Sequence, residues 1–105
     1  MIEVKFFSSG GKLSGFRLQG HSGYAEQGAD IVCASVSSAA YMTANTITEI
    51  IGLAPEIAVD DGFMELKLTS KEADKAQNVL LGFRLHMLQL EEQYSKYIIL
   101  KFSEV

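Results

Sequence analysis

Two residues of this chain have the side-chain types that nucleophilic catalysis needs. Cys33 is the only cysteine, His21 is one of two histidines, and a glycine-containing loop separates them by twelve positions. A thiolate attacks carbonyl groups, and an imidazole can take up the thiol proton and deliver it to a leaving group. We therefore expect the loop to fold back so that Cys33 and His21 form a catalytic Cys/His dyad.

The residues just before Cys33 are typical of a helix start. Asp30 is a favoured N-cap residue, which places Cys33 in the first helical turn, where the positive end of the helix dipole stabilises a thiolate. First-turn amides have no partner within the helix, so the Cys33 N–H is the expected oxyanion donor. The sequence leaves two roles open for Asp30: a helix cap alone, or a carboxylate that also orients His21.

The segment from Ser22 to Ala29 is expected to be a mobile lid that orders when substrate binds. Ser22 begins this substrate loop. Gly23 and Gly28 lower the cost of moving its backbone, and Tyr24 offers a ring to an aromatic substrate residue.

Structural roles stay open for several of these residues. A single cysteine in a small domain is often only a buried apolar side chain. Ser37, one turn after Cys33, either hydrogen-bonds within the site or packs between elements. His86 has no cysteine or carboxylate at ligand spacing, so we expect it to be structural or exposed. The sequence holds no Cys-x-x-Cys pair and no phosphate-binding glycine motif, so neither a metal nor a cofactor is expected.

Two motifs carry a resemblance to a known family. Gly20-His21-Ser22-Gly23 and the run Asp-Ile-Val-Cys-Ala-Ser-Val-Ser (residues 30–37) resemble the Gly-His and Asp-(Ile/Leu)-Val-Cys-Ala-x-Val-Ser signatures of the bacterial ribosomal-processing cysteine proteases. That family consists of small single-domain proteins of about this length. The resemblance implies that His21 and Cys33 are the catalytic pair. It also implies the substrate: large-subunit ribosomal protein number twenty-seven, whose N-terminal extension is removed after a pair of aromatic residues.

Composition narrows the class of protein. The chain has 105 residues, of which 48% are hydrophobic and 21% charged, as in one ordinary globular domain spanning residues 1–105. The net charge of −4 argues against direct nucleic-acid binding and suits a basic protein substrate. The N-terminus does not resemble a signal peptide, and no apolar run is long enough for a membrane span, so we expect a cytoplasmic protein.

Hydrophobic patterning predicts the elements that must position these residues. Alternating apolar residues predict strands over 2–7, 13–20, 56–59, 63–68 and 97–103, and periods of three and four predict helices over 31–51 and 70–93. Thr69 and Glu72 match a capping box at the start of the second helix. The order ββαββαβ predicts an α+β fold with two layers, in which two helices pack on a mainly antiparallel five-stranded sheet.

A second leucine stripe on the predicted 70–93 helix suggests a homodimer. Leu81, Leu85 and Leu88 lie roughly a hundred degrees around the helix from the stripe that faces the sheet. An exposed row of this kind is a liability in a monomer, so a second subunit would bury it. The alternative is that the first helix or the N-terminal hairpin covers it.

These observations favour a cysteine endopeptidase with a Cys33/His21 dyad. Two alternatives remain: a ribosome-associated binding module in which Cys33 is buried and inert, and an acyl-transfer enzyme that acts on small esters or thioesters. Reactivity of the Cys33 thiol toward an alkylating agent separates the enzymes from the binding module.

Overall fold

Five strands and two long helices follow one another in the order that the sequence predicts. The structure is a computed structural model, and it describes residues 1–26 and 30–105. The elements are β1 (Ile2–Ser9), β2 (Lys12–Gln19), α1 (Ile31–Asn45), η1 (Thr46–Ile50), β3 (Glu56–Asp60), β4 (Phe63–Lys67), α2 (Ser70–Gln93) and β5 (Ile98–Glu104).

The strands form one mixed sheet in the order β3-β4-β2-β1-β5. Two hairpins, β1–β2 and β3–β4, are joined by antiparallel pairing of β2 with β4. The last strand, β5, pairs with β1 in the parallel sense, with Ile2 opposite Ile98. The fold class is therefore confirmed, including a sheet that is antiparallel at every pairing except β1–β5.

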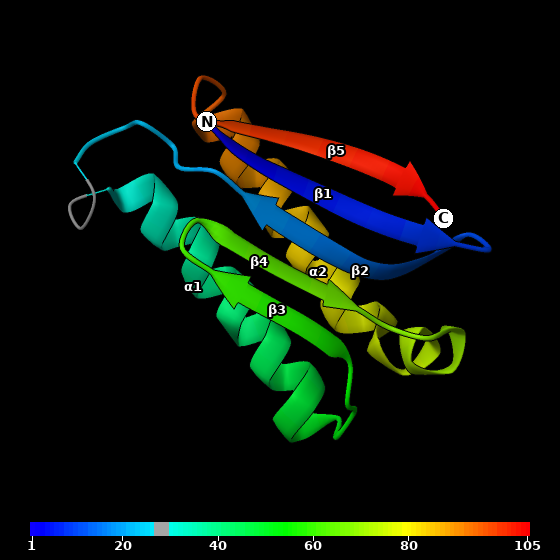
Figure 1. Cartoon of the computed structure of the whole chain (residues 1–105). Helices are drawn as coiled ribbons and strands as arrows, with labels where there is room; N and C mark the ends of the chain where they lie inside the picture. Colours follow the sequence, from blue (N-terminus) through cyan, green and yellow to red (C-terminus); the bar gives the residue numbers. More distant parts are fainter. Residues whose placement is uncertain (27–29) are drawn as a thin grey trace.

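Both helices lie on one face of the sheet (Figure 1), which gives the two predicted layers. Strand alternation explains this, since Ile2, Val4 and Phe6 of β1 are buried on the helix side. Phe83 of α2 packs with its ring centroid 5.5 Å from Phe6 and 4.7 Å from Phe16. Rings of this size supply much of the apolar area that holds a small core together.

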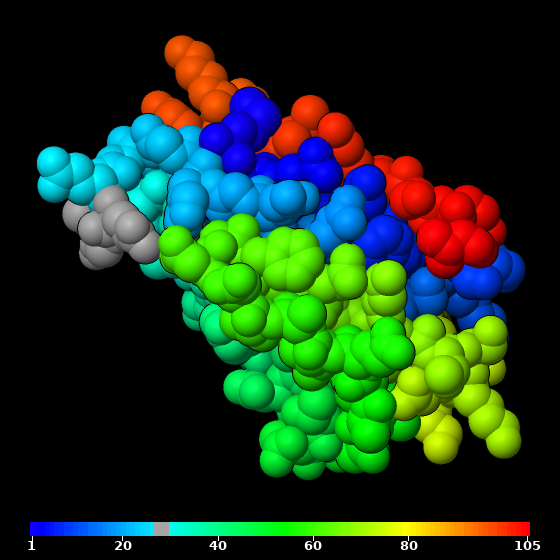
Figure 2. All heavy atoms as spheres, in the orientation of Figure 1, coloured from blue at the N-terminus to red at the C-terminus, as the bar shows by residue number. Residues whose placement is uncertain are grey.

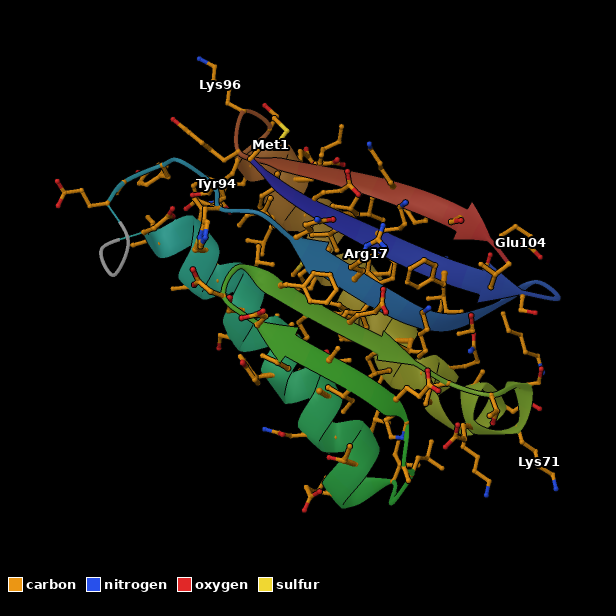
Figure 3. All side chains as sticks on the ribbon, viewed as in Figure 1. Met1, Arg17, Lys71, Tyr94, Lys96 and Glu104 are labelled. Carbon is orange, nitrogen blue, oxygen red and sulfur yellow. The ribbon has the colours of Figure 1, made fainter. Side chains whose placement is uncertain are left out.

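The opposite face of the sheet is polar and open to solvent. Arg17, labelled in Figure 3, lies on this face, where its guanidinium is 3.6 Å from the Glu65 carboxylate and 5.8 Å from the centre of the Phe7 ring. At the sheet edge every residue of β3 is exposed, and in Figure 2 the β3–β4 hairpin lies at the surface above the end of the first helix.

The helix starts are set by side-chain caps. Thr69 accepts a hydrogen bond from the Glu72 N–H, and the Glu72 carboxylate accepts one from the Thr69 N–H, so the predicted capping box is confirmed. The first helix continues to about the predicted end, but its last turn, η1, is π-helical. Near this junction the hydroxyls of Thr43 in α1 and Thr46 in η1 each donate to the carbonyl four residues earlier, a type of contact that often bends helices.

The second leucine stripe of α2 remains uncovered in this chain. Leu81, Leu85 and Leu88 are 39%, 58% and 40% exposed. The alternative that α1 or the N-terminal hairpin covers them is therefore wrong, because both elements pack on other sides of α2. In the part of the chain that is described, no helix has the length and apolar character needed to cross a bilayer.

Candidate active site

Three segments distant in sequence meet at one end of the molecule. These are the end of β2, the start of α1 and the turn between β3 and β4 (Figure 1). Between them lies a cleft of about 480 Å³, lined by His21 from the first segment, Cys33 and Ser37 from the second, and the turn residues Asp60 to Gly62 from the third. The structure thus brings the predicted candidates Cys33, His21, Asp30 and Ser37 to a single cleft, together with Gly23 of the loop.

Asp30 is the N-cap of α1, as the sequence predicts. Its Oδ1 atom accepts hydrogen bonds from the N–H groups of Val32 and Cys33, each 3.0 Å long. Cys33 therefore lies in the first turn of the helix, half-buried, with its sulfur at the positive end of the helix dipole. This is an environment that favours a thiolate.

The expectation that the Cys33 amide is free to bind an oxyanion is wrong. Cys33 is the third residue of the helix, and a carboxylate at the N-cap reaches the amides of the second and third residues. The Asp30 side chain therefore already occupies this donor.

A different backbone amide points at the sulfur. The Ser22 N–H donates to Cys33 Sγ at 3.3 Å, and the Ser22 hydroxyl donates to Asp30 Oδ2. Ser22 is buried, and these contacts hold it against the helix start; ordering of the loop on substrate binding stays a prediction. Because charge-assisted hydrogen bonds are stronger than neutral ones, the Ser22 amide stabilises the sulfur more as a thiolate than as a thiol.

Asp30 is held in its charged form by these contacts. Burial opposes its ionisation and is the largest single influence, but the hydrogen bonds from Ser22, Cys33 and Val32 together outweigh burial and leave the pKa of Asp30 below its ordinary value. One ionised carboxylate thus fixes both the helix start and the residue that contacts the sulfur.

We expect the loss of this cap to destabilise the protein in a pH-dependent way. Since the pKa of Asp30 is lower in the folded protein than in the unfolded chain, its stabilisation is complete above the ordinary Asp pKa of about 3.9 and is lost as the pH falls through the folded value. Asp30→Ala should lower the free energy of unfolding by about 1–2 kcal/mol at neutral pH.

Urea denaturation at neutral pH and at about pH 3 measures this effect. Asp30→Asn is the matched control, because an amide oxygen can still cap the helix but does not titrate. Its stability should change less between the two pH values than that of the wild type. An equal change in both proteins would show that Asp30 is not the titrating group.

Tyr24 is engaged within the chain. Its ring packs edge-to-face on Tyr97 and Tyr94, with centroid separations of 5.1 and 6.1 Å. Tyr94, labelled in Figure 3, lies beside the loop that follows β2. The predicted contact of Tyr24 with a substrate ring would therefore replace contacts that the ring already makes. Gly28, also predicted for the substrate loop, lies outside the described residues.

His21 lines the same cleft as Cys33, beside the β3–β4 turn, and its side chain is 54% exposed. In the described residues, no hydrogen bond joins its ring to the Cys33 sulfur, which is common in substrate-free enzymes because catalytic contacts tighten on binding. Ser37 is exposed one turn beyond Cys33, and His86 is exposed on α2, away from the cleft.

Sequence reasoning missed two contributors to this site. One is the Ser22 backbone amide on the sulfur. The other is the turn between β3 and β4, the gap between two predicted strands; in the fold it lines the cleft beside His21. The first depends on how the loop after β2 packs on the start of α1, and the second depends on the pairing of β4 with β2.

A half-buried thiol at a capped helix start, with a backbone amide on its sulfur and an imidazole in the same cleft, is the arrangement of a cysteine hydrolase. Comparison with known proteins makes this class specific. A family model described as cysteine protease Prp matches residues 1–99. The chain belongs to this family and is a cysteine protease.

Named relatives and solved structures resemble this chain over most of its length. The ribosomal processing cysteine protease Prp of Staphylococcus aureus is 30% identical over 95 residues, which cover 89% of this chain and 90% of that protein. The protein of the same name from Bacillus subtilis is 28% identical, covering 75% of this chain and 76% of its own. A crystal structure of an essential ribosomal processing protease Prp from S. aureus with a covalently linked product peptide superposes with a TM-score of 0.89 at 30% identity, covering 97% of this chain and 99% of that one.

Proposed function

We propose that this protease cleaves peptides with Cys33 as the nucleophile and His21 as the general base and acid. The observation that carries the proposal is the position of the Cys33 sulfur, which lies at a capped helix start and accepts a hydrogen bond from the Ser22 N–H. His21 lines the same cleft, and a movement of its ring on substrate binding would bring it to the sulfur. The motif resemblance assigns the same two residues.

The proposed reaction proceeds through a thioester. Cys33 gives its proton to His21, and the thiolate attacks the scissile carbonyl carbon, so that the carbonyl electrons move to oxygen. The tetrahedral intermediate collapses, the C–N bond breaks, and the leaving amine takes the proton from His21. Water then gives a proton to His21 and attacks the thioester carbon. The C–S bond breaks, the acid product leaves, and the Cys33 thiolate takes the proton back from His21.

We further propose that the substrate is the N-terminal extension of large-subunit ribosomal protein number twenty-seven, removed in support of ribosome assembly. The relatives are named ribosomal processing cysteine proteases, which supports a ribosomal substrate. A second S. aureus structure, with a TM-score of 0.84 at 28% identity, holds a substrate peptide. The net charge of −4 suits a basic ribosomal protein, and it does not suit direct contact with nucleic acid. We propose a cytoplasmic location, because ribosome assembly in bacteria takes place there.

The substrate is tested by incubating the protein with the same organism's ribosomal protein number twenty-seven, followed by mass spectrometry. Release of one N-terminal peptide after a pair of aromatic residues supports the proposal. An intact substrate, with hydrolysis of small thioesters instead, would favour the acyl-transfer alternative.

A second copy of this chain is the partner that we propose for the exposed leucine stripe of α2. Leu88 and Ile99 of β5 line one shallow depression together with Glu91, Glu92 and Ser95, so exposed apolar side chains of the helix and of the sheet edge lie beside polar ones. Patches of this kind in small proteins commonly mark interfaces. A symmetric pair would bury the stripe of each copy against the other.

Sedimentation at micromolar concentration should therefore report a dimer, and Leu85→Glu should convert it to a monomer. A carboxylate in the middle of an apolar interface would lose its water without gaining a partner. Lys71→Glu is the matched control, since it adds the same group at an exposed position ten residues before the stripe. A monomeric wild type contradicts the dimer, and a dimer that survives Leu85→Glu places the interface elsewhere.

A further inference from the structure

The imidazole of His21 lies against the turn between β3 and β4. Its Nε2 atom is 4.0 Å from Oδ2 of Asp61. The turn is tied to the strand end that carries His21, because the Gly20 N–H donates to the Gly62 carbonyl at 2.9 Å. The backbone contact therefore sets the distance between the ring and the Asp61 carboxylate.

Gly62 makes this approach of the ring to the turn feasible. A Cβ atom at this position would lie 2.8 Å from His21 Nε2, closer than van der Waals contact allows. The residue also has φ of +64°, a conformation that side chains other than glycine rarely adopt. The ring can therefore pack directly on the backbone of the turn, with Asp61 beside it.

The other carboxylate near the catalytic cysteine is fully engaged elsewhere. Asp30 uses Oδ1 for the amides of Val32 and Cys33 and Oδ2 for the Ser22 hydroxyl. Of the two roles that the sequence left open for Asp30, the structure shows the helix cap. The carboxylate that faces the imidazole belongs to Asp61.

We propose that Asp61 is the positioning residue of His21. With a peptide in the cleft, its carboxylate approaches from the 4.0 Å seen in the free protein to accept a hydrogen bond from Nε2–H, and it favours the tautomer that carries its proton there. Nδ1 is then left with a lone pair for the Cys33 proton. The inference rests on the proposed Cys33/His21 dyad. Asp61 acts through His21 and does not touch the reacting atoms.

Solvent weakens this contact in the free protein, and the exclusion of solvent strengthens it during turnover. The side chains of His21 and Asp61 are 54% and 77% exposed, and ion pairs as exposed as this one are weak in water. A peptide in the cleft covers the ring and the turn, and exclusion of water strengthens the attraction between imidazolium and carboxylate. The effect therefore belongs to kcat more than to KM.

Steady-state kinetics with a saturating peptide test the proposal. Asp61→Asn keeps the size of the side chain and the turn preference but removes the charge. It should lower kcat roughly tenfold with KM nearly unchanged, and Asp61→Glu should recover part of the loss. Glu56→Gln, which removes a carboxylate from the far end of the same hairpin, should behave as the wild type.

Three kinetic outcomes would overturn the proposal. An equal fall in kcat for Asp60→Asn would assign the effect to the net charge of the turn. A rise in KM at constant kcat for Asp61→Asn would make Asp61 a substrate contact. A wild-type kcat in Asp61→Asn, together with an inactive Cys33→Ala, would remove this inference and leave the proposed function standing.

Nitrogen-15 NMR of the imidazoles in Cys33→Ala with a saturating peptide bound gives a readout that needs no turnover. At a pH where the rings are neutral, His21 should be mainly the Nε2–H tautomer in this protein and a mixture of tautomers once Asp61→Asn is added. His86, far from the cleft, is the internal control and should not change. Identical His21 spectra in the two proteins would contradict a positioning role.

Discussion

Cys33→Ala is expected to abolish peptide cleavage while the fold remains intact. The substitution removes the sulfur that the thioester requires. The side chain is only partly buried at the edge of the core, so its loss leaves little cavity. Cys33→Ser should also be nearly inactive, although its hydroxyl can still accept the Ser22 hydrogen bond, because a hydroxyl is far harder to ionise than a thiol.

Mass spectrometry of the cleaved substrate measures the loss, and thermal unfolding followed by circular dichroism checks the fold. Ser35→Ala is a matched control on the same helix, since Ser35 does not line the cleft. It should cleave at the wild-type rate. Cleavage by Cys33→Ala at that rate would remove Cys33 from the mechanism.

His21→Ala should lower kcat/KM at least about a hundredfold, the lower end of what general acid–base catalysis contributes. The truncation removes the group that takes the thiol proton and protonates the leaving amine. Stability should change little, because the ring is more than half exposed and lies on the surface of a glycine turn.

The rate of peptide cleavage between about pH 6 and pH 9 is the appropriate measurement, since imidazole changes charge near the start of this range. His86→Ala is the control, because His86 is the other histidine of the chain and lies away from the cleft. An unchanged rate across this range for His21→Ala would show that another group is the base.

The sequence predicted the elements well because local signals agree with the tertiary fold at nearly every point. Asp30 and the Thr69–Glu72 pair are caps whose effect depends on neighbouring residues alone. The alternating β1 residues and the α2 stripe face a single core, so their periodicity survives in the structure. Family motifs supplied the candidate residues of the site.

What the sequence did not reveal depends on contacts between distant segments. The role of the β3–β4 turn follows from the pairing of β4 with β2, which brings Asp61 and Gly62 to His21. The anchored state of Ser22 follows from its contact with a carboxylate eight residues later. The occupied Cys33 amide could have been predicted, because a carboxylate N-cap reaches the third residue of its helix.

The parallel pairing of β5 with β1 also has a consequence for the order of folding. The Ser8 hydroxyl and the Glu104 carboxylate, which meet at the end of this pairing, are 96 residues apart. Closing so large a loop costs entropy that the β1–β2 and β3–β4 hairpins, with their two-residue turns, do not incur. Docking of β5 is therefore expected among the last steps. The strands and turn that form the cleft can associate earlier, while the edge strand opposite the cleft completes the sheet.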